Sequence, residues 1–247
     1  MKIKKIIRGF LSPKFIADFF LFKKQMRDTK SLFSFGRLYP ILNDINEENG
    51  TMDRIYFLQD LYVAQEIFKM NPARHVDVGS SVAGFVGHVA SFREIEVFDV
   101  RPLALEMRNL QFKKRDFMAE LTDELIECTD SLSCLHALEH FGLGRYGDPV
   151  DVNGHEKGFE NLARMVKKEG MLYLSVPLGP LRVEFNAHRV FSAVYLFNMV
   201  KKHFDVKAFT YISDNKKIHI DVPIDEEFIK KNFGCKYGCA IFCLKKR

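Results

Sequence analysis

The stretch HVDVGSSVAGFVGHV, residues 75–89, decides the fold. Residues 75–78 could form a short buried strand, and residues 83–92 carry apolar side chains at helical spacing. The turn Gly79-Ser80-Ser81 lies between the two. A strand that passes through a tight turn into a helix leaves unpaired backbone amides at the start of the helix, and such amides can bind a ligand.

Strand and helix patterns alternate on both sides of this turn. The alternation predicts an α/β fold with a mostly parallel sheet and helices on both of its faces. Ligands of such sheets bind beyond the carboxyl ends of the strands. The expected helices cover residues 52–70, 83–92, 122–127, 156–170 and 191–204, and the expected strands cover residues 75–79, 94–100, 110–117, 130–138, 171–179, 205–213 and 237–246.

The positive charge is concentrated at the N-terminus. Residues 1–30 hold nine Lys or Arg and two Asp, a balance of +7, so the rest of the chain sums to −2 within the net charge of +5. A nearly neutral body disfavours nucleic acid as a partner, because proteins that bind it usually carry a basic patch on the folded domain. The sequence predicts a basic, Phe-rich N-terminal extension over residues 1–34 and one folded domain over residues 35–247.

The apolar segment FIADFFLF, residues 15–22, allows two interpretations. Flanked by lysines, it could lie on anionic lipid as an amphipathic segment. It could also pack on the domain as a helix, with Phe15, Phe19 and Phe22 facing inward. No uncharged apolar run is long enough to predict a spanning helix, and the five cysteines show no even pairing, which favours a reducing compartment. We expect a cytoplasmic protein, and the basic segment leaves peripheral contact with the inner face of the membrane open.

Three classes of ligand use a turn between a strand and a helix. A nucleotide phosphate loop requires Lys and Ser or Thr where this chain has Phe85 and Val86. A dinucleotide site requires a glycine where this chain has Ser81, which weakens that interpretation. S-adenosylmethionine is the third ligand, and the acidic residues near the turn favour it.

Three aspartates stand at or just after the ends of the first three expected strands. Asp77, which precedes the turn, suits a cationic amino acid or a sulfonium better than a pyrophosphate. Asp99, at the end of the second expected strand, can accept both hydroxyls of a ribose. Asp116 follows the third strand, where a carboxylate can meet an adenine amino group. Together the three acids predict a nucleoside site.

Four segments resemble successive motifs of the class I S-adenosylmethionine-dependent methyltransferases. They are VDVGSSVAGFVG (76–87), VFDVRP (97–102), RDFM (115–118) and SLSCLHALEHFG (131–142), with Ser81-Val82-Ala83 departing from the more glycine-rich family pattern. The resemblance implies a Rossmann-like sheet of seven strands with the last one antiparallel, and S-adenosylmethionine as cofactor with S-adenosylhomocysteine as product. The cofactor contacts it implies are Asp77, Gly79, Ser80, Ser81, Asp99, Val100, Arg101, Asp116, Phe117 and His136.

A closer resemblance is to a bacterial methyltransferase-like family of unknown function that is often found among surface-polysaccharide genes. It rests on YFLQDLYVA (56–64), LHALEHFGLGRYGD (135–148) and LSVPLGPLRVEFNAHRVF (174–191), and it covers roughly residues 35–200. It implies O-methylation of a sugar or sugar nucleotide in the biosynthesis of capsule or lipooligosaccharide. The likeness to the methyltransferase superfamily implies that the helix before the first strand lies over the cofactor and contacts the ligand through Tyr56, Gln59 and Asp60.

Methyl transfer to a hydroxyl needs alignment of the reactants and a group that removes one proton. His136, Glu139 and His140 share one face if the chain forms a helical turn after the strand. We expect His140 to be the base, with His188 as the alternative. The candidate catalytic residues are therefore His140, His188 and Glu139, and the candidate substrate-binding residues are Arg145, Tyr146, Asp148, Glu184, Asn186 and Arg189.

The segment PLRVEFNAHRVF is expected to begin a helix at the mouth of the site. No metal is expected, because the spacing of the nearby His, Asp and Glu residues matches no compact ligand pattern. Three other functions stay open: methylation of nitrogen or carbon, cofactor binding without catalysis in a membrane-associated glycan assembly, and binding of a sugar nucleotide without methyl transfer.

Overall fold

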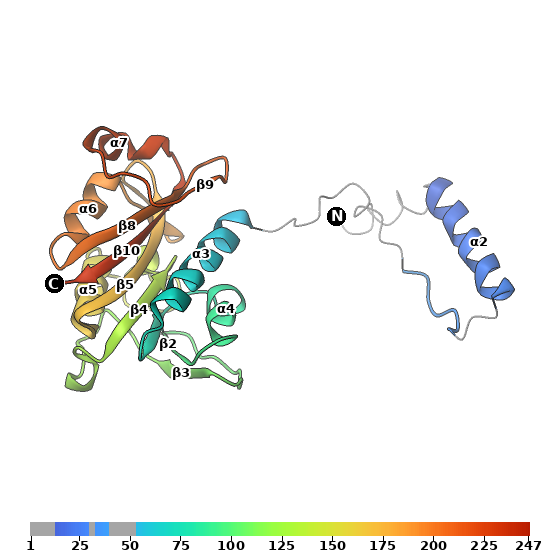
Figure 1. Cartoon of the computed structure of the whole chain (residues 1–247), viewed down its shortest axis with the longest axis horizontal. Coiled ribbons are helices and arrows are strands. Elements are labelled where there is room, and N and C mark those ends of the chain that lie inside the picture. The colour runs from blue at the N-terminus through green and yellow to red at the C-terminus, as the bar shows by residue number, and fades with distance from the viewer. Residues whose placement is uncertain (1–12, 30–32, 40–52) are drawn as a thin grey trace. The chain divides into compact units, whose positions relative to one another are not determined.

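The computed structural model describes residues 13–29, 33–39 and 53–247, and the chain divides into two compact units, residues 1–52 and 53–247 (Figure 1). In the first unit α2, Pro13–Asp28, confirms a helix across the Phe-rich segment, and no described side chain of α2 is buried. The predicted extension covers residues 1–34, of which residues 1–12 and 30–32 lie outside the described residues. Residues 40–52, which follow the predicted domain boundary, also lie outside them. Within the described ranges, no helix is long and apolar enough to cross a membrane.

The second unit is built on one sheet, which has eight strands in the described part of the chain, in the order β3-β2-β1-β4-β5-β10-β8-β9. Neighbours from β3 to β5 are parallel, whereas β10 is antiparallel to both β5 and β8. The α/β class and the Rossmann-like order are therefore confirmed, with one strand more than the seven expected. The strands are β1 (His75–Val78), β2 (Ile95–Asp99), β3 (Leu110–Lys114), β4 (Thr129–Leu135), β5 (Val166–Leu178), β8 (Phe204–Ile212), β10 (Gly238–Lys246) and the additional β9 (Ile218–His219).

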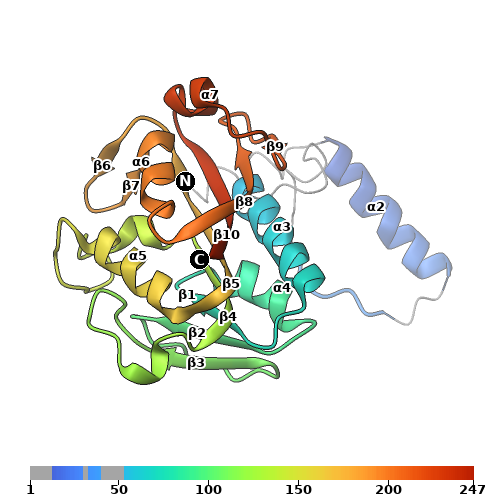
Figure 2. The same ribbon diagram turned by 60° about the vertical axis from the view of Figure 1, so that its left-hand side comes forward.

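Helices cover both faces of this sheet (Figure 2). α3 (Arg54–Met70) and α4 (Gly87–Ala90) pack on one face, and α5 (Gly154–Met165) and α6 (Ala193–Val200) on the other. α3 begins at Asp53, whose carboxylate accepts from the amide of Ile55, and it ends at Asn71 in the left-handed conformation. A π-helical turn, Val82–Val86, precedes α4, and α7 (Glu226–Lys230) lies before β10. The two apolar cores hold the strand ends in place from opposite sides of the sheet.

The strand after α5 begins earlier than the helical pattern of residues 156–170 predicts. α5 ends at Met165, and Val166 already pairs with Thr129 of β4. Gly170 is therefore inside β5 and does not end the helix. A Cβ atom at Gly170 would lie 2.9 Å from a methyl group of Val166 and 3.0 Å from the carbonyl oxygen of Asp130, so the tight packing favours glycine here.

A β-hairpin replaces the helix start expected at the mouth of the site. β6 (Arg182–Glu184) pairs antiparallel with β7 (His188–Val190). The following helix, α6, begins only after Ser192, whose hydroxyl accepts from the amide of Tyr195. This side-chain cap fixes the start of α6 downstream of the hairpin, and the prediction of a helix start at residues 180–191 was wrong.

Candidate functional site

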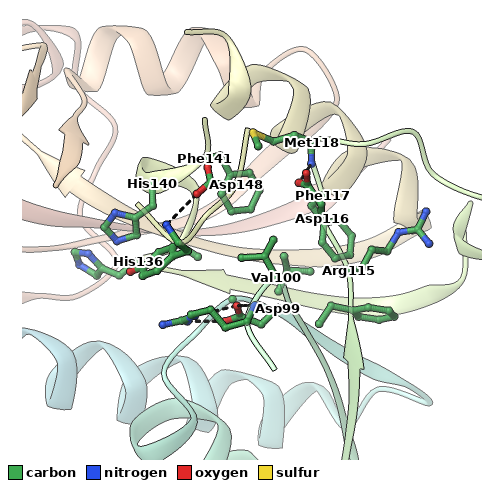
Figure 3. Close-up of a pocket in the computed structure, with 16 residues that line it drawn as sticks. Asp99, Val100, Arg115, Asp116, Phe117, Met118, His136, His140, Phe141 and Asp148 are labelled. Carbon is green, nitrogen blue, oxygen red and sulfur yellow. Dashed lines mark hydrogen bonds and ion pairs between the residues drawn. The ribbon is translucent and has the colours of Figure 1, made fainter. Parts of the chain in front are cut away.

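Two adjoining pockets open beyond the carboxyl ends of β1, β2 and β4. The inner pocket, about 510 Å³ including open solvent, is lined by mostly apolar groups that include Val100, Phe117 and Phe141 (Figure 3). The outer pocket, about 1490 Å³ including open solvent, is more polar and includes Tyr56 and His188 in its wall.

Gly79 forms part of the wall of both pockets, directly after β1. Its φ of +75° belongs to the left-handed region, and its amide donates to the carbonyl of Phe98 at 2.9 Å. A Cβ atom here would lie 2.9 Å from the Cβ of Ala137. Only glycine therefore allows the turn to pass this close to the end of β4.

Asp77 lies beneath the turn and does not line either pocket. Its fully buried carboxylate accepts from the hydroxyl of Ser80 at 2.5 Å and from the hydroxyl of Ser133 at 2.6 Å. Burial raises the pKa of Asp77 to about 6, although these hydrogen bonds oppose the rise. Asp77 therefore stabilises the turn, whereas Ser80 and Ser81 line the outer pocket.

Asp99 ends β2 and lines both pockets, but its carboxylate already has a partner. The guanidinium of Arg101 donates to Oδ1 at 3.0 Å and to Oδ2 at 2.6 Å. Arg101 also lies over the ring of Tyr146, with 4.4 Å between the guanidinium carbon and the ring centroid. Asp99 thus lies at the rim of both pockets with its carboxylate paired, and ribose binding by this residue stays a prediction.

Asp116 and its neighbours form the far wall of the inner pocket. One oxygen of Asp116 accepts from the amide of Met118 at 2.8 Å, and Figure 3 draws this carboxylate beside Phe117. Phe117 is buried and packs edge-to-face on Phe98 at 5.5 Å. With Val100 these rings make an apolar slot that suits a planar base, with a carboxylate at its edge.

His136, Glu139 and His140 come together as the helical spacing predicts, because residues 138–140 form a 3-10 turn. His136 Nδ1 donates to Glu139 Oε1 at 2.9 Å, and His140 Nε2 lies 3.7 Å from the same oxygen. Burial lowers the pKa of His136, but Cys239 and Glu139 outweigh burial, so that the net shift is upward. His136 and His140 line both pockets.

The glycine-rich loop after His140 is shaped by Asp148. The carboxylate of Asp148 accepts from the amides of Gly142, Gly144 and Tyr146 at 3.1, 3.3 and 3.0 Å. This use of its oxygens makes Asp148 a residue that shapes the loop, although it also lines the inner pocket. Arg145 is exposed at the outer pocket, and Tyr146 lines both pockets.

The hairpin brings only one of its four predicted site residues into the outer pocket. His188 lines the pocket, 3.4 Å from Glu184 and beside the ring of Tyr237 at 5.3 Å. Glu184 and Asn186 are exposed on the hairpin, and neither lines the two pockets. Arg189 is buried and donates to the carbonyls of Phe141 and Val152 at 2.6 and 3.2 Å, so it fastens the hairpin to the loop of residues 141–152.

Sequence reasoning missed Tyr237, which lines the outer pocket from the turn before β10. No local motif marks it.

Tyr56 of α3 lines the same pocket as expected, and its ring lies 5.0 Å from that of His136. Gln59 and Asp60 are buried beside each other, and neither lines the two pockets. Among the described residues, no group of three or more His, Cys, Asp or Glu side chains is arranged to hold a metal ion.

Solved structures with the same fold are methyltransferases. The N-methyltransferase NodS of Bradyrhizobium japonicum, in complex with S-adenosylhomocysteine, superposes with a TM-score of 0.50 at 11% identity over 79% of this chain and 93% of that chain. The 1,6-didemethyltoxoflavin-N1-methyltransferase of Burkholderia thailandensis, with 1,6-didemethyltoxoflavin and S-adenosylhomocysteine bound, gives 0.52 at 13% identity over 77% and 79%. This protein therefore has the fold of the class I S-adenosylmethionine-dependent methyltransferases.

A family model that matches residues 104–245 is described as Caenorhabditis protein of unknown function, DUF268, and the chain belongs to that family. The comparison with curated proteins found no match. Membership of a bacterial family that is found among surface-polysaccharide genes stays a prediction.

Proposed function

We propose that this protein binds S-adenosylmethionine and methylates a hydroxyl oxygen of a small molecule. The observation that carries the proposal is that the inner pocket, with its apolar slot and the carboxylates of Asp99 and Asp116, shares the wall residue His140 with the outer pocket. One pocket can thus hold a nucleoside while the other holds an acceptor beside a candidate base. The two solved methyltransferases with S-adenosylhomocysteine bound support the same cofactor.

The residues of the inner pocket fit an adenosyl group. Asp116 would accept from the adenine amino group between Val100 and Phe117, and Asp99 would accept from the ribose hydroxyls once Arg101 releases it. Gly79 lines both pockets and, because it lacks a Cβ atom, lets the turn lie against Ala137. When bound, the cofactor supplies an electrophilic methyl group. The protein then has to orient the acceptor and to remove its proton, for which His140 is the candidate.

Calorimetric titration with S-adenosylhomocysteine tests the cofactor. We expect micromolar binding by the wild type, none by Asp99→Ala, and unchanged binding by Asp205→Ala, which removes an exposed acid paired with Arg247. Failure of the wild type to bind, or equal binding by Asp99→Ala, would contradict the proposal.

A sugar or sugar nucleotide is the acceptor that we propose, in surface glycan biosynthesis. The outer pocket supports this class through Tyr56, Tyr237, His188 and Arg145, which combine aromatic faces with hydrogen-bonding groups. The sequence resemblance supports it as well. Incubation with radiolabelled S-adenosylmethionine and a panel of sugar nucleotides should yield a labelled methyl ether. Label on a nitrogen or carbon atom would refute O-methylation and keep the cofactor.

Binding of a sugar nucleotide without methyl transfer is the second candidate. Arg101 favours it, because it lines both pockets and its guanidinium can pair with the diphosphate of a sugar nucleotide, a group that S-adenosylmethionine lacks. In that case sugar nucleotides would bind in the calorimeter and S-adenosylhomocysteine would not.

We also propose peripheral contact of a cytoplasmic protein with anionic membrane. The support is the +7 balance of residues 1–30 and the exposure of Phe20, Leu21 and Phe22 on α2. The full chain should sediment with phosphatidylglycerol vesicles and not with phosphatidylcholine vesicles. A variant lacking residues 1–30 should stay in the supernatant with both, and sedimentation of this variant would refute the proposal.

A further inference from the structure

The β6–β7 hairpin reaches the candidate base through one backbone carbonyl. The oxygen of Ala187, in the hairpin turn, lies 2.7 Å from His140 Nδ1 and 2.8 Å from Arg145 Nη1. A carbonyl oxygen can only accept hydrogen bonds, so Nδ1 of His140 must carry a hydrogen. In the neutral ring the other nitrogen, Nε2, is then the one that is free to take up a proton.

We infer that Arg145 is a positioning residue for His140, and that with the Ala187 carbonyl it holds the ring as the neutral tautomer with hydrogen on Nδ1. The inference deepens the proposed function, because it assumes that His140 is the base. Arg145 occupies a second acceptor site of the carbonyl that binds His140. It thereby fixes the direction in which that carbonyl points.

The groups around the ring favour the neutral form on balance. The Arg145 guanidinium lies 3.3 Å from Nδ1, and because both atoms are donors, this contact opposes a second positive charge. Glu139 lies 3.7 Å from Nε2 and favours a charged ring, but the same oxygen also accepts from His136. The Tyr146 ring packs edge-to-face on His140 at 5.6 Å. Burial, Arg145 and His136 outweigh Glu139 and the Ala187 bond, and the pKa of His140 is lowered.

The hairpin is fastened to the segment that carries His140 at a second point. Arg189 of β7 donates to the carbonyl of Phe141, the residue after His140, and to the carbonyl of Val152. The ring and its backbone are therefore both held by the hairpin. During transfer, the acceptor oxygen would form its bond to the methyl carbon as the carbon–sulfur bond breaks, and the acceptor proton would pass to Nε2 of His140.

Nitrogen-15 NMR of the imidazole rings tests this inference without any acceptor. The long-range correlation pattern identifies the tautomer, and the His140→Gln variant assigns the signal. In the wild type we expect hydrogen on Nδ1 and a titration midpoint below that of an ordinary histidine. Arg145→Gln should raise the midpoint and mix the tautomers, whereas Arg145→Lys should restore the low midpoint because the charge is kept.

Arg182→Gln is the matched control, because it removes another arginine at the hairpin, one that is paired with Glu184. It should leave the His140 signals unchanged. Hydrogen on Nε2 in the wild type, or coincident titrations of the wild type and Arg145→Gln, would overturn the inference. Calorimetry with S-adenosylhomocysteine reports separately on the proposed function, so that either can fail while the other stands.

Discussion

Arg101 holds both carboxylate oxygens of Asp99, its near neighbour in the chain. The backbone amide of Arg101 also donates to Oδ1 of Asp99, at 2.8 Å. A ligand that uses this carboxylate must therefore displace an arginine side chain that is already stacked on Tyr146. Arg101 and the ribose hydroxyls of a ligand therefore compete for the carboxylate of Asp99.

Removing the competitor should strengthen binding. We expect Arg101→Ala to bind S-adenosylhomocysteine roughly 1.4- to five-fold more tightly, because an ion pair that is half-exposed on the arginine side contributes about 0.2–1 kcal/mol that the ligand must replace. The affinities of the two proteins should converge at high salt, since salt weakens the pair in the wild type. Lys113→Ala, which removes a charge paired with Glu96, should leave affinity unchanged. Weaker binding by Arg101→Ala would show that the arginine contacts the ligand.

Asp77 should make the stability depend on pH in an unusual direction. The pKa of this buried acid is about 6 in the folded protein against 3.8 for an ordinary Asp, a difference that corresponds to about 3 kcal/mol. The folded state therefore binds the proton more tightly than the unfolded chain, and this residue's contribution to the free energy of unfolding falls as pH rises from about 4 to 6. Urea unfolding of Asp77→Asn should lack that fall. Parallel pH profiles for the two proteins would refute the shift.

Arg189 should stabilise the folded protein and should not contact the acceptor. Arg189→Met leaves buried carbonyls without their donor, and we expect a loss of about 2–4 kcal/mol in the free energy of unfolding. Arg108→Met, at an exposed position, should change it by less than about 0.5 kcal/mol. Chemical denaturation measures both. A stable Arg189→Met variant that had lost only substrate affinity would instead restore the role in substrate binding.

Substitutions of the two candidate bases, His140 and His188, should have different kinetic effects, which can be measured once an acceptor is found. His140→Gln should lower kcat by about 100-fold or more, the usual contribution of a general base, whereas His188→Gln should mainly raise KM. Because the pKa of His140 is lowered, the wild-type rate should persist as pH falls and decline only below the range of an ordinary histidine. Steady-state kinetics from pH 5 to 8 would decide the assignment. A larger effect of His188→Gln on kcat would transfer the role of base to His188.

The elements that follow local rules were predictable from sequence. The alternation of strands and helices predicted the sheet, and the positions of Asp99 and Asp116 placed them at the rim of the inner pocket. The spacing of His136, Glu139 and His140 predicted their contact through a helical turn. In each case, one short segment with a regular period determines the arrangement.

The remaining features depend on partners that are distant in the chain. Asp77 lies near the end of β1 as predicted, but Ser133 of β4 donates to its carboxylate, and Asp77 lines neither pocket. Arg189 was expected to bind substrate, whereas its guanidinium binds carbonyls of a loop that comes well before the hairpin in the chain. Tyr237 reaches the outer pocket because β10 inserts next to β5. No local pattern encodes such contacts, since they arise from tertiary packing.

The additional strand β9 has a consequence for how copies of the protein meet. β9 forms one edge of the sheet with only two residues, Ile218 and His219. The opposite edge, β3, carries Lys113 and Lys114. A very short strand and exposed lysines are both poor templates for a further strand, because the first offers few free hydrogen-bonding groups and the second bring like charges together. The β3 edge and the two-residue strand β9 are therefore both poor sites for strand addition.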